Sequence, residues 1–229
     1  AYENEIVEPP RVVALSAFQI AATETTNQQY ARVVSDHQER NNQPVVDVTW
    51  KQARSFCQQV GGDLPTEAQW EYAARGGSRT RWSFGEEESQ LGRYAWFDYN
   101  SDTSQVHDVR QKRPNPLGLY DLHGNAWEWT ADWHDERYYA RSPATDPTGP
   151  DAGSVRVRRG GSWHTWPFYA RCAYRNWNSP QTRYTLVGMR LLREAAAPRS
   201  AEPGRSFRIM AAVAAAPPPA ALDPHEPGP

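Results

Sequence analysis

Cysteine is scarce in this chain, which carries only Cys57 and Cys172 among its 229 residues. Two cysteines do not make the disulfide framework of a small secreted domain, although one disulfide between them could form. The hydrophobic share is also low, at 38%. Ten tryptophans and eleven tyrosines offset it, because each buries a large area and carries a polar group. We therefore expect an aromatic core.

The sequence also lacks a long apolar run and an excess of positive charge. No run approaches the roughly 20 residues that a membrane-spanning helix needs, and no secretory signal is visible. The formal net charge is -2 and the isoelectric point about 6.3. Nucleic-acid binders usually carry a basic excess, so we expect no nucleic acid and no membrane span among the partners.

The first third of the chain predicts one strand and three helices. Residues 11–20 alternate in part between apolar and polar side chains, which is typical of a strand. Thr25 or Thr26 is a natural N-cap for a helix that follows, in which Tyr30 and the two valines after it fall at helical spacing.

Two clearer helices come next, and each begins with a capping box. Thr49 with Gln52 predicts the first helix, which ends near Gly61 or Gly62. Thr66 and Gln69 predict the second one, which ends at Gly76. We expect the inward-facing residues of the two helices to be Trp50, Ala53, Phe56, Cys57 and Val60, and Trp70, Ala73 and Ala74.

The rest of the chain predicts a loop-rich sheet and a tail. Residues 78–194 hold short aromatic strands between Gly, Pro, Asn and Asp turns, which predicts an α+β domain over 1–194 with two main helices against an irregular antiparallel sheet. Residues 195–229 are rich in Ala and Pro. They offer too little apolar area to offset the entropy of ordering, so we expect a disordered tail.

Four segments carry a family resemblance: ETTNQQYARV, VTWKQARSFCQQVGGDLPTEAQWEYAARGG, NPLGLYDLHGNAWEWTADW and RVRRGGSW…ARCAYRN…VGMRLL. In order and spacing the chain resembles the formylglycine-generating enzyme, or sulfatase-modifying factor, family over nearly all of residues 11–193. The resemblance implies a variant of the C-type lectin fold with little regular secondary structure. That expectation agrees with the α+β prediction, but a fold does not by itself give a function.

The catalytic residues that the resemblance implies are missing. Enzymes of the family oxidise a sulfatase cysteine to formylglycine with Cu(I) held by two cysteines, and soft thiolates suit that ion. In the family both ligands lie shortly after the GGS[WY] motif, which here is Gly160–Trp163. Thr165 and Pro167 stand at the corresponding places. We therefore expect no copper and no catalytic residue of this kind, and the chain is expected not to be such an enzyme.

The resemblance also implies that Cys57 and Cys172 occupy structural positions whose partner cysteines are replaced by Leu191 and Ala74. Two free, buried thiols are then expected, packed as small hydrophobic groups. Unpaired thiols and the lack of a visible signal slightly favour a cytoplasmic location.

A structural calcium site near GNAWEW is a further implication of the resemblance. Asn125 and Glu128 would supply side-chain oxygens, which suit Ca²⁺. In the alternative interpretation, these two residues only tie the turn by hydrogen bonds, while Trp127 and Trp129 lie in the core.

The segment after GGSW has the composition of a contact surface. Rigid aromatic rings mixed with Asn, Ser and Thr are typical of binding loops. We expect a non-catalytic module that binds a protein or a small-molecule ligand through residues 164–186. The candidate contact residues are His164, Thr165, Trp166, Phe168, Tyr169, Tyr174, Asn176, Trp177, Asn178, Ser179, Gln181, Thr182, Tyr184 and Thr185.

Variable proteins of diversity-generating retroelements, several of which use this lectin-like scaffold, place their variation in the same region. Those elements mutate adenines, so AAC codons become NNC codons, which cannot encode Trp or Gln. Only Trp166, Trp177 and Gln181 of the contact residues break this rule. Diversification of the segment is therefore a hypothesis, and an ordinary aromatic family motif is its alternative.

Two other functions stay open. One is an oxidoreductase or maturation enzyme with altered chemistry in the same pocket, which would need convergent polar groups near Ser162, His164 and Arg175. The other is a structural accessory domain. The many arginines of residues 156–190 are expected to pair with Glu67, Glu71 and Glu128 or to stack on aromatic rings, so an anion site is not expected.

Overall fold

The computed structural model describes residues 11–101 and 105–195. Apart from Ala195, the predicted tail lies outside the described residues. Within them, no helix has the length and apolar character needed to cross a membrane. The elements follow in the order β1 (Phe18–Ile20), α1 (Asn27–Tyr30), α2 (Trp50–Gln59), α3 (Glu67–Arg75), the 3-10 helix η1 (Glu88–Arg93), β2 (Trp127–Trp133), β3 (Arg156–Arg159), the 3-10 helix η2 (Pro167–Ala170), β4 (Asn176–Asn178), β5 (Val187–Met189) and β6 (Leu192–Glu194).

Capping boxes start all three α-helices; the sequence predicts those at Thr49 and Thr66, and for the first helix only an N-cap at Thr25 or Thr26. The side chains of Thr26, Thr49 and Thr66 each accept a hydrogen bond from the backbone N–H three residues on. The glutamine side chain at that position accepts one from the backbone N–H of the threonine. Helix α3 ends at Gly76, whose φ of 55° is left-handed. These contacts lie within one helical turn and need no tertiary partner, which is why sequence patterns predict where the helices begin.

The strands are shorter than the sequence predicts. Only Phe18–Ile20 of the predicted strand 11–20 forms a ladder, because β6 supplies three partners and no more. Upstream, Ala14 makes an isolated bridge to Thr145. The predicted helix after Thr26 likewise has only four residues before it passes into turns.

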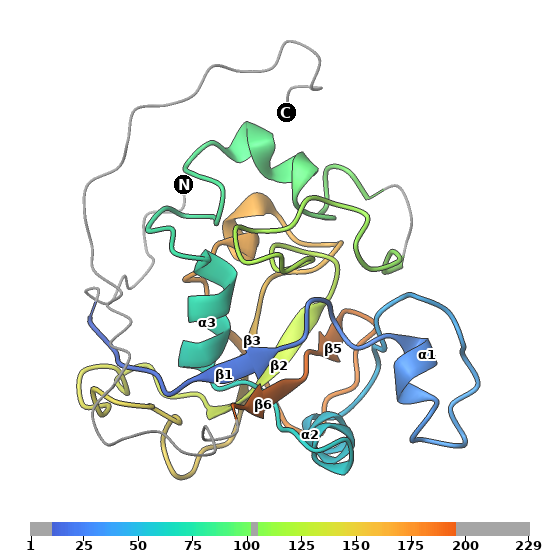
Figure 1. The fold of residues 1–229 in the computed structure, drawn as a ribbon, viewed down its shortest axis with the longest axis horizontal. Coiled ribbons are helices and arrows are strands. Elements are labelled where there is room, and N and C mark those ends of the chain that lie inside the picture. The colour runs from blue at the N-terminus through green and yellow to red at the C-terminus, as the bar shows by residue number, and fades with distance from the viewer. Residues whose placement is uncertain (1–10, 102–104, 196–229) are drawn as a thin grey trace.

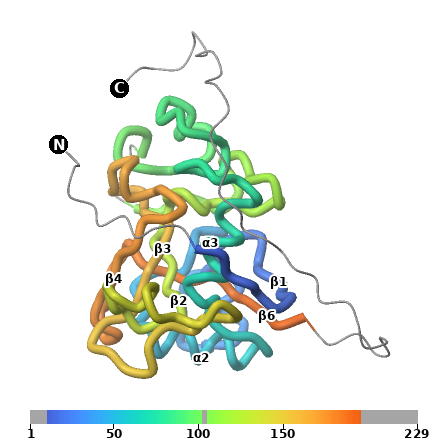
Figure 2. The backbone as a smooth tube through the Cα atoms, turned by 90° about the vertical axis from the view of Figure 1, so that its left-hand side faces the viewer, coloured from blue at the N-terminus to red at the C-terminus, as the bar shows by residue number. Residues whose placement is uncertain are grey.

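Two sheets form the frame (Figure 1). The larger has the order β4-β3-β2-β5, and the smaller pairs β1 with β6. Neighbouring strands are antiparallel except β2 and β5, which run parallel. The predicted antiparallel pairing is confirmed for the other pairs, and the parallel pairing of β2 with β5 makes the larger sheet a mixed one. In both views α2 lies below the strands, and the loops of residues 78–101 and 105–126 lie at the opposite end (Figure 2).

The core is aromatic, as the composition predicts. Trp127 and Trp129 of β2 are 2% and 0% exposed, and they pack with Trp50 and Phe56 of α2. Trp70 of α3 belongs to a second cluster. At Gly188 of β5 an added Cβ would lie 2.4 Å from the Val45 carbonyl oxygen, so only glycine lets this strand approach so closely.

Candidate binding face

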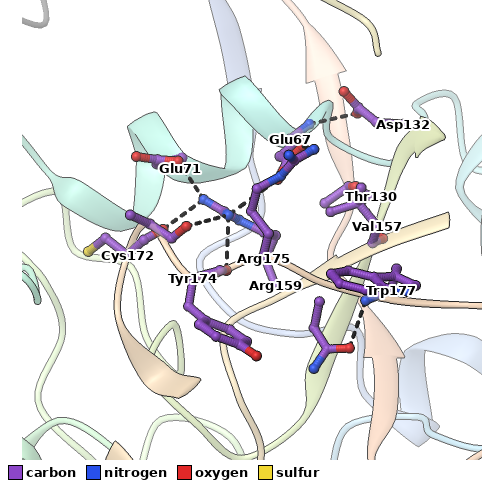
Figure 3. Close-up of polar contacts among 12 residues, drawn as sticks. Glu67, Glu71, Thr130, Asp132, Val157, Arg159, Cys172, Tyr174, Arg175 and Trp177 are labelled. Carbon is purple, nitrogen blue, oxygen red and sulfur yellow. Dashed lines mark hydrogen bonds and ion pairs between the residues drawn. The ribbon is translucent and has the colours of Figure 1, made fainter. Parts of the chain in front are cut away.

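Arg159 of β3 ties the segment after GGSW to helix α3 (Figure 3). Its fully buried guanidinium contacts the carboxylates of Glu67 and Glu71 at 3.2 and 2.5 Å. It also donates to the backbone carbonyl of Cys172 at 2.7 Å, and to the carbonyls of the next two residues. This buried cation therefore fixes the backbone turn that begins at Cys172, within the segment that carries the predicted contact residues.

A second arginine reaches the same helix from that turn. Arg175 donates to both carboxylate oxygens of Glu67, at 2.7 and 2.9 Å. Burial alone would raise the pKa of Glu67, but the charges of Arg175 and Arg159 outweigh it and lower that pKa. The Glu67 backbone N–H donates to Asp132 at 2.7 Å. Burial and the charge of Glu67 raise the pKa of Asp132 to about 8.

The GNAWEW turn rests on a third arginine. Arg190 donates to both carboxylate oxygens of Glu128 at 2.6 to 3.0 Å, and the indole N–H of Trp70 adds a bond at 2.6 Å. Asn125 has a left-handed φ of 62°, and its side chain donates to Glu24 at 2.7 Å. Glu24 is fully buried, and its pKa is raised well above the usual range by burial and by neighbouring carboxylates. Sequence reasoning missed Glu24, because nothing in its own segment marks it as buried.

These contacts do not suit Glu128 as a calcium ligand. Both of its oxygens already accept hydrogen bonds from Arg190, so a cation would have to displace a buried guanidinium. The Asn125 side-chain oxygen accepts the His107 backbone N–H at 2.8 Å. Among the described residues, no group of three or more His, Cys, Asp and Glu side chains is arranged to hold a metal. These contacts match the alternative interpretation, in which Asn125 and Glu128 tie the turn by hydrogen bonds. Calcium binding stays a prediction.

The fourteen predicted contact residues all reach the surface at least in part. None is buried, although Pro167, Ala170 and Cys172 between them are. Trp166, Trp177 and Tyr184 are among the most exposed large side chains, at 47%, 42% and 49%. The predicted residues thus have the exposure that a contact residue needs, which the unselected Ala173 and Arg183 of the same segment share.

The structure brings one subset of these residues together. The rings of Phe168, Tyr169 and Tyr174 meet pairwise at centroid distances of 5.0 to 5.4 Å. Tyr174 also approaches Trp127 of the core at 6.2 Å. This set, which we call the aromatic triad, is half-buried and forms the floor of one part of the face.

Other predicted residues lie apart from the triad. Trp177 stacks on His134 at 3.9 Å, and it alternates along β4 with Asn176 and Asn178, which point to the opposite side of the sheet. His164 lies 3.8 Å from the carboxylate of Asp98. The predicted residues thus occupy more than one patch and do not form a single ring around one centre.

Sequence reasoning missed Arg158 as a member of this face. It lies on β3 between the two residues that point toward α3, and its Nε donates to Asn176 at 3.3 Å. Its guanidinium carbon lies 4.8 Å from the centre of the Trp127 ring. The predicted ion pairs are confirmed for Arg159, Arg175 and Arg190, but Arg158 has no carboxylate partner in the described chain.

The polar groups required for altered chemistry do not converge. Arg175 is bound to Glu67, His164 lies near Asp98, and the buried Ser162 hydroxyl accepts the His164 backbone N–H. Two hollows in the described part of the chain lie elsewhere. One is lined by residues 13–20 with Tyr72, and the other by residues of α1 and α2.

Both cysteines are free and buried, as predicted. Cys57 belongs to the cluster around Trp129 and Cys172 to the cluster around Trp70. Burial raises the pKa of each thiol to about 12, so neither is a thiolate near neutral pH.

The model of the family described as "Sulfatase-modifying factor enzyme 1-like domain" matches residues 1–195, and the chain belongs to this family. The formylglycine-generating enzyme of Streptomyces coelicolor is 40% identical over 175 residues, which are 70% of this chain and 56% of that protein. The chain thus spans about half the length of the curated relatives it matches first.

Solved structures show the same fold. The Treponema denticola variable protein 1 superposes with a TM-score of 0.77 at 30% identity, covering 85% of this chain and 90% of that one. PvdO from Pseudomonas aeruginosa has a TM-score of 0.61 at 26% identity, covering 69% and 66%. The fold is therefore the C-type lectin-like fold of formylglycine-generating enzymes and variable proteins.

Proposed function

We propose that this chain is a non-catalytic binding module that holds a protein or small-molecule ligand through residues 164–186. One observation carries the proposal. All fourteen predicted contact side chains reach the surface, whereas buried ion pairs hold the backbone beneath them. Surface aromatic rings on a rigid frame lose little conformational entropy when they bind, which is how recognition loops gain affinity.

The similarity to the Treponema denticola variable protein 1 extends over most of both chains, and we take it as support for a binding role. It also bears on the diversification hypothesis. The test is the DNA around the gene, where a near-copy of the codons for residues 160–190 that differs only at adenines is expected. If no such copy lies beside a reverse transcriptase gene, retroelement diversification is rejected and the binding proposal is unaffected.

The enzyme alternative draws on the 40% identity to a formylglycine-generating enzyme. The geometry supports it less well, because Cys57 and Cys172 lie in different clusters and Ser162, His164 and Arg175 point to different partners. We expect no formylglycine when the chain is incubated with Cu(I), oxygen and a Cys-x-Pro-x-Arg peptide. The Streptomyces coelicolor enzyme is the positive control. Turnover of that peptide would overturn the proposal.

Binding itself is tested by selection from a displayed library of random 12-residue peptides. Selected peptides should lose affinity for a Trp166→Ser/Tyr184→Ser variant, whose changes lie at exposed positions and leave the core intact. The matched control is Leu117→Ser, because Leu117 is 52% exposed and lies outside the proposed face. Peptides that bind all three proteins equally would contradict the assignment of the face.

A further inference from the structure

Arg158 is a half-buried arginine of residues 156–190 that has no carboxylate partner among the described residues. Arg159, Arg175 and Arg190 are bound by carboxylates. Arg156 lies between the rings of Trp50 and Trp133 and donates to the Ala131 carbonyl. Arg158 makes one hydrogen bond, from Nε to Asn176, and its two Nη atoms have no acceptor among the described residues.

The surroundings hold this guanidinium in place. Trp127 lies beneath it at 4.8 Å, and Asn176 binds its Nε edge. Tyr174 and Tyr184 lie close enough to interact with its charge, and burial lowers the pKa of Arg158 to about 10. Even so it stays protonated near neutral pH, as a half-buried cation whose outer edge is unpaired. Stacking of this kind fixes the plane of a guanidinium and reduces the entropy lost when it binds a ligand.

The same part of the face has a further unsatisfied group. The side-chain oxygen of Asn178 is buried without a hydrogen-bond partner in the described residues. Asn176 and Asn178 pair with Arg158 and Arg156 across the β3–β4 ladder, so their side chains share one side of the sheet. A ligand at this place would meet a donor edge at Arg158, with the aromatic triad alongside.

We infer that Arg158 is the centre of a subsite for an acidic side chain of a protein partner, whose carboxylate binds the two free Nη atoms while a neighbouring apolar residue packs on the aromatic triad. This inference rests on the proposed binding function and names the ligand chemistry of that site. A carboxylate fits because its two oxygens match the fork of one guanidinium. Phosphate sites commonly gather several cations or a helix N-terminus, and the nearby Arg156 is enclosed between tryptophans.

The experiment compares displayed 12-residue peptide libraries selected in parallel on the unchanged chain, on Arg158→Gln and on Arg183→Gln. Arg183 is the matched control: it is exposed in the same segment and donates to Gln52, with no carboxylate partner in the part of the chain that the structure describes. We expect Asp and Glu to be enriched in peptides selected on the unchanged chain and on Arg183→Gln, and not on Arg158→Gln. Selection on the unchanged chain without acidic enrichment would overturn the inference.

A double-mutant cycle then assigns the contact. Synthetic peptides from the selection, amidated at the C-terminus, are compared with versions whose acidic residue is changed to Asn or Gln. Each single change should weaken binding roughly tenfold, and the two together should cost little more than one, as for a direct charge pair. Arg158→Lys should bind in between, since it keeps the charge but not the fork. Independent, multiplicative losses would show that the carboxylate binds elsewhere.

Failure of the inference and failure of the proposed function give different results. If peptides are selected that depend on Trp166 and Tyr184 but carry no acidic residue, the face binds ligands and the Arg158 subsite is wrong. If no peptide is enriched on the unchanged chain, both are contradicted. Circular dichroism and urea unfolding of each variant check that the changes leave the fold intact.

Discussion

The guanidinium of Arg190 lies against the carboxylate of Glu128 with N–O distances of 2.6 to 3.0 Å, and neither side chain is exposed to solvent. Arg190 comes directly after β5 and Glu128 lies on β2, so the pair joins the two parallel strands. Arg190 also donates to the backbone carbonyls of Ala21 and Tyr120. This one cation thus connects segments from the beginning, middle and end of the domain.

We predict that Arg190→Met lowers the free energy of unfolding by about 3–5 kcal/mol, because it leaves buried carboxylates without a counter-charge. Glu128→Gln should cost less. Glu24 and Asp121 also interact with Arg190, and losing the Glu128 charge removes one of the causes that raise the pKa of each, so these acids can ionise and supply a negative charge. Urea unfolding followed by tryptophan fluorescence measures both. If Glu128→Gln lowers the free energy of unfolding as much as Arg190→Met does, Glu24 and Asp121 do not replace Glu128 as counter-charges of Arg190.

Asp132 gives a prediction for pH dependence. Its folded-state pKa is about 8, raised by burial and by the charge of Glu67, against about 3.9 in an unfolded chain. Between these two values the folded state holds a proton that the unfolded state has released. The free energy of unfolding that depends on this group therefore falls as pH rises from about 4 to 8, by about 1.4 kcal/mol per pH unit, and levels off above pH 8.

The test compares the unchanged chain with Asp132→Asn, which cannot ionise. The difference in unfolding free energy should grow in favour of Asp132→Asn from pH 5 to pH 8 and then stay constant. Urea titrations at each pH provide the measurement. A constant difference across the whole range would mean that Asp132 is ionised in the folded state at all of these pH values.

Gly188 gives a prediction about close packing. A Cβ at this position would lie 2.4 Å from the Val45 carbonyl oxygen, so Gly188→Ala must push two buried segments apart. We expect a loss of about 1–3 kcal/mol in unfolding free energy. Gly92→Ala is the control, since its Cβ would meet the Asn100 amide at an ordinary 3.5 Å. Equal effects of the two substitutions would show that the contact with Val45 relaxes freely.

The features that the sequence predicts correctly are mostly local. Capping boxes such as Thr49 with Gln52 lie within one turn, and the glycine after α3 follows the helix directly. The inward faces of α2 and α3 follow from helical spacing, and Trp70 and Ala73 are buried as expected. The free cysteines were also predicted, but from the family resemblance and not from spacing.

Other features depend on how distant segments meet, and the sequence does not show them. The parallel pairing of β2 with β5 joins Glu128 to Gly188, which are 60 residues apart in the chain. Glu24 has no mark of burial until Asn125 and Ala126 donate to it. Arg158 resembles the neighbouring arginines in sequence, and only the placement of the carboxylates shows that it lacks one.

The four side chains of strand β3 alternate between the two sides of the sheet, and the two sides have different roles. Val157 and Arg159 are buried toward α3, while Arg156 and Arg158 project to the other side. A substitution at Arg158 therefore alters what the surface presents without touching the ion pairs that hold the strand. In this segment folding and recognition depend on different positions, so the surface has room to change in evolution or in a designed library while the frame beneath it stays the same.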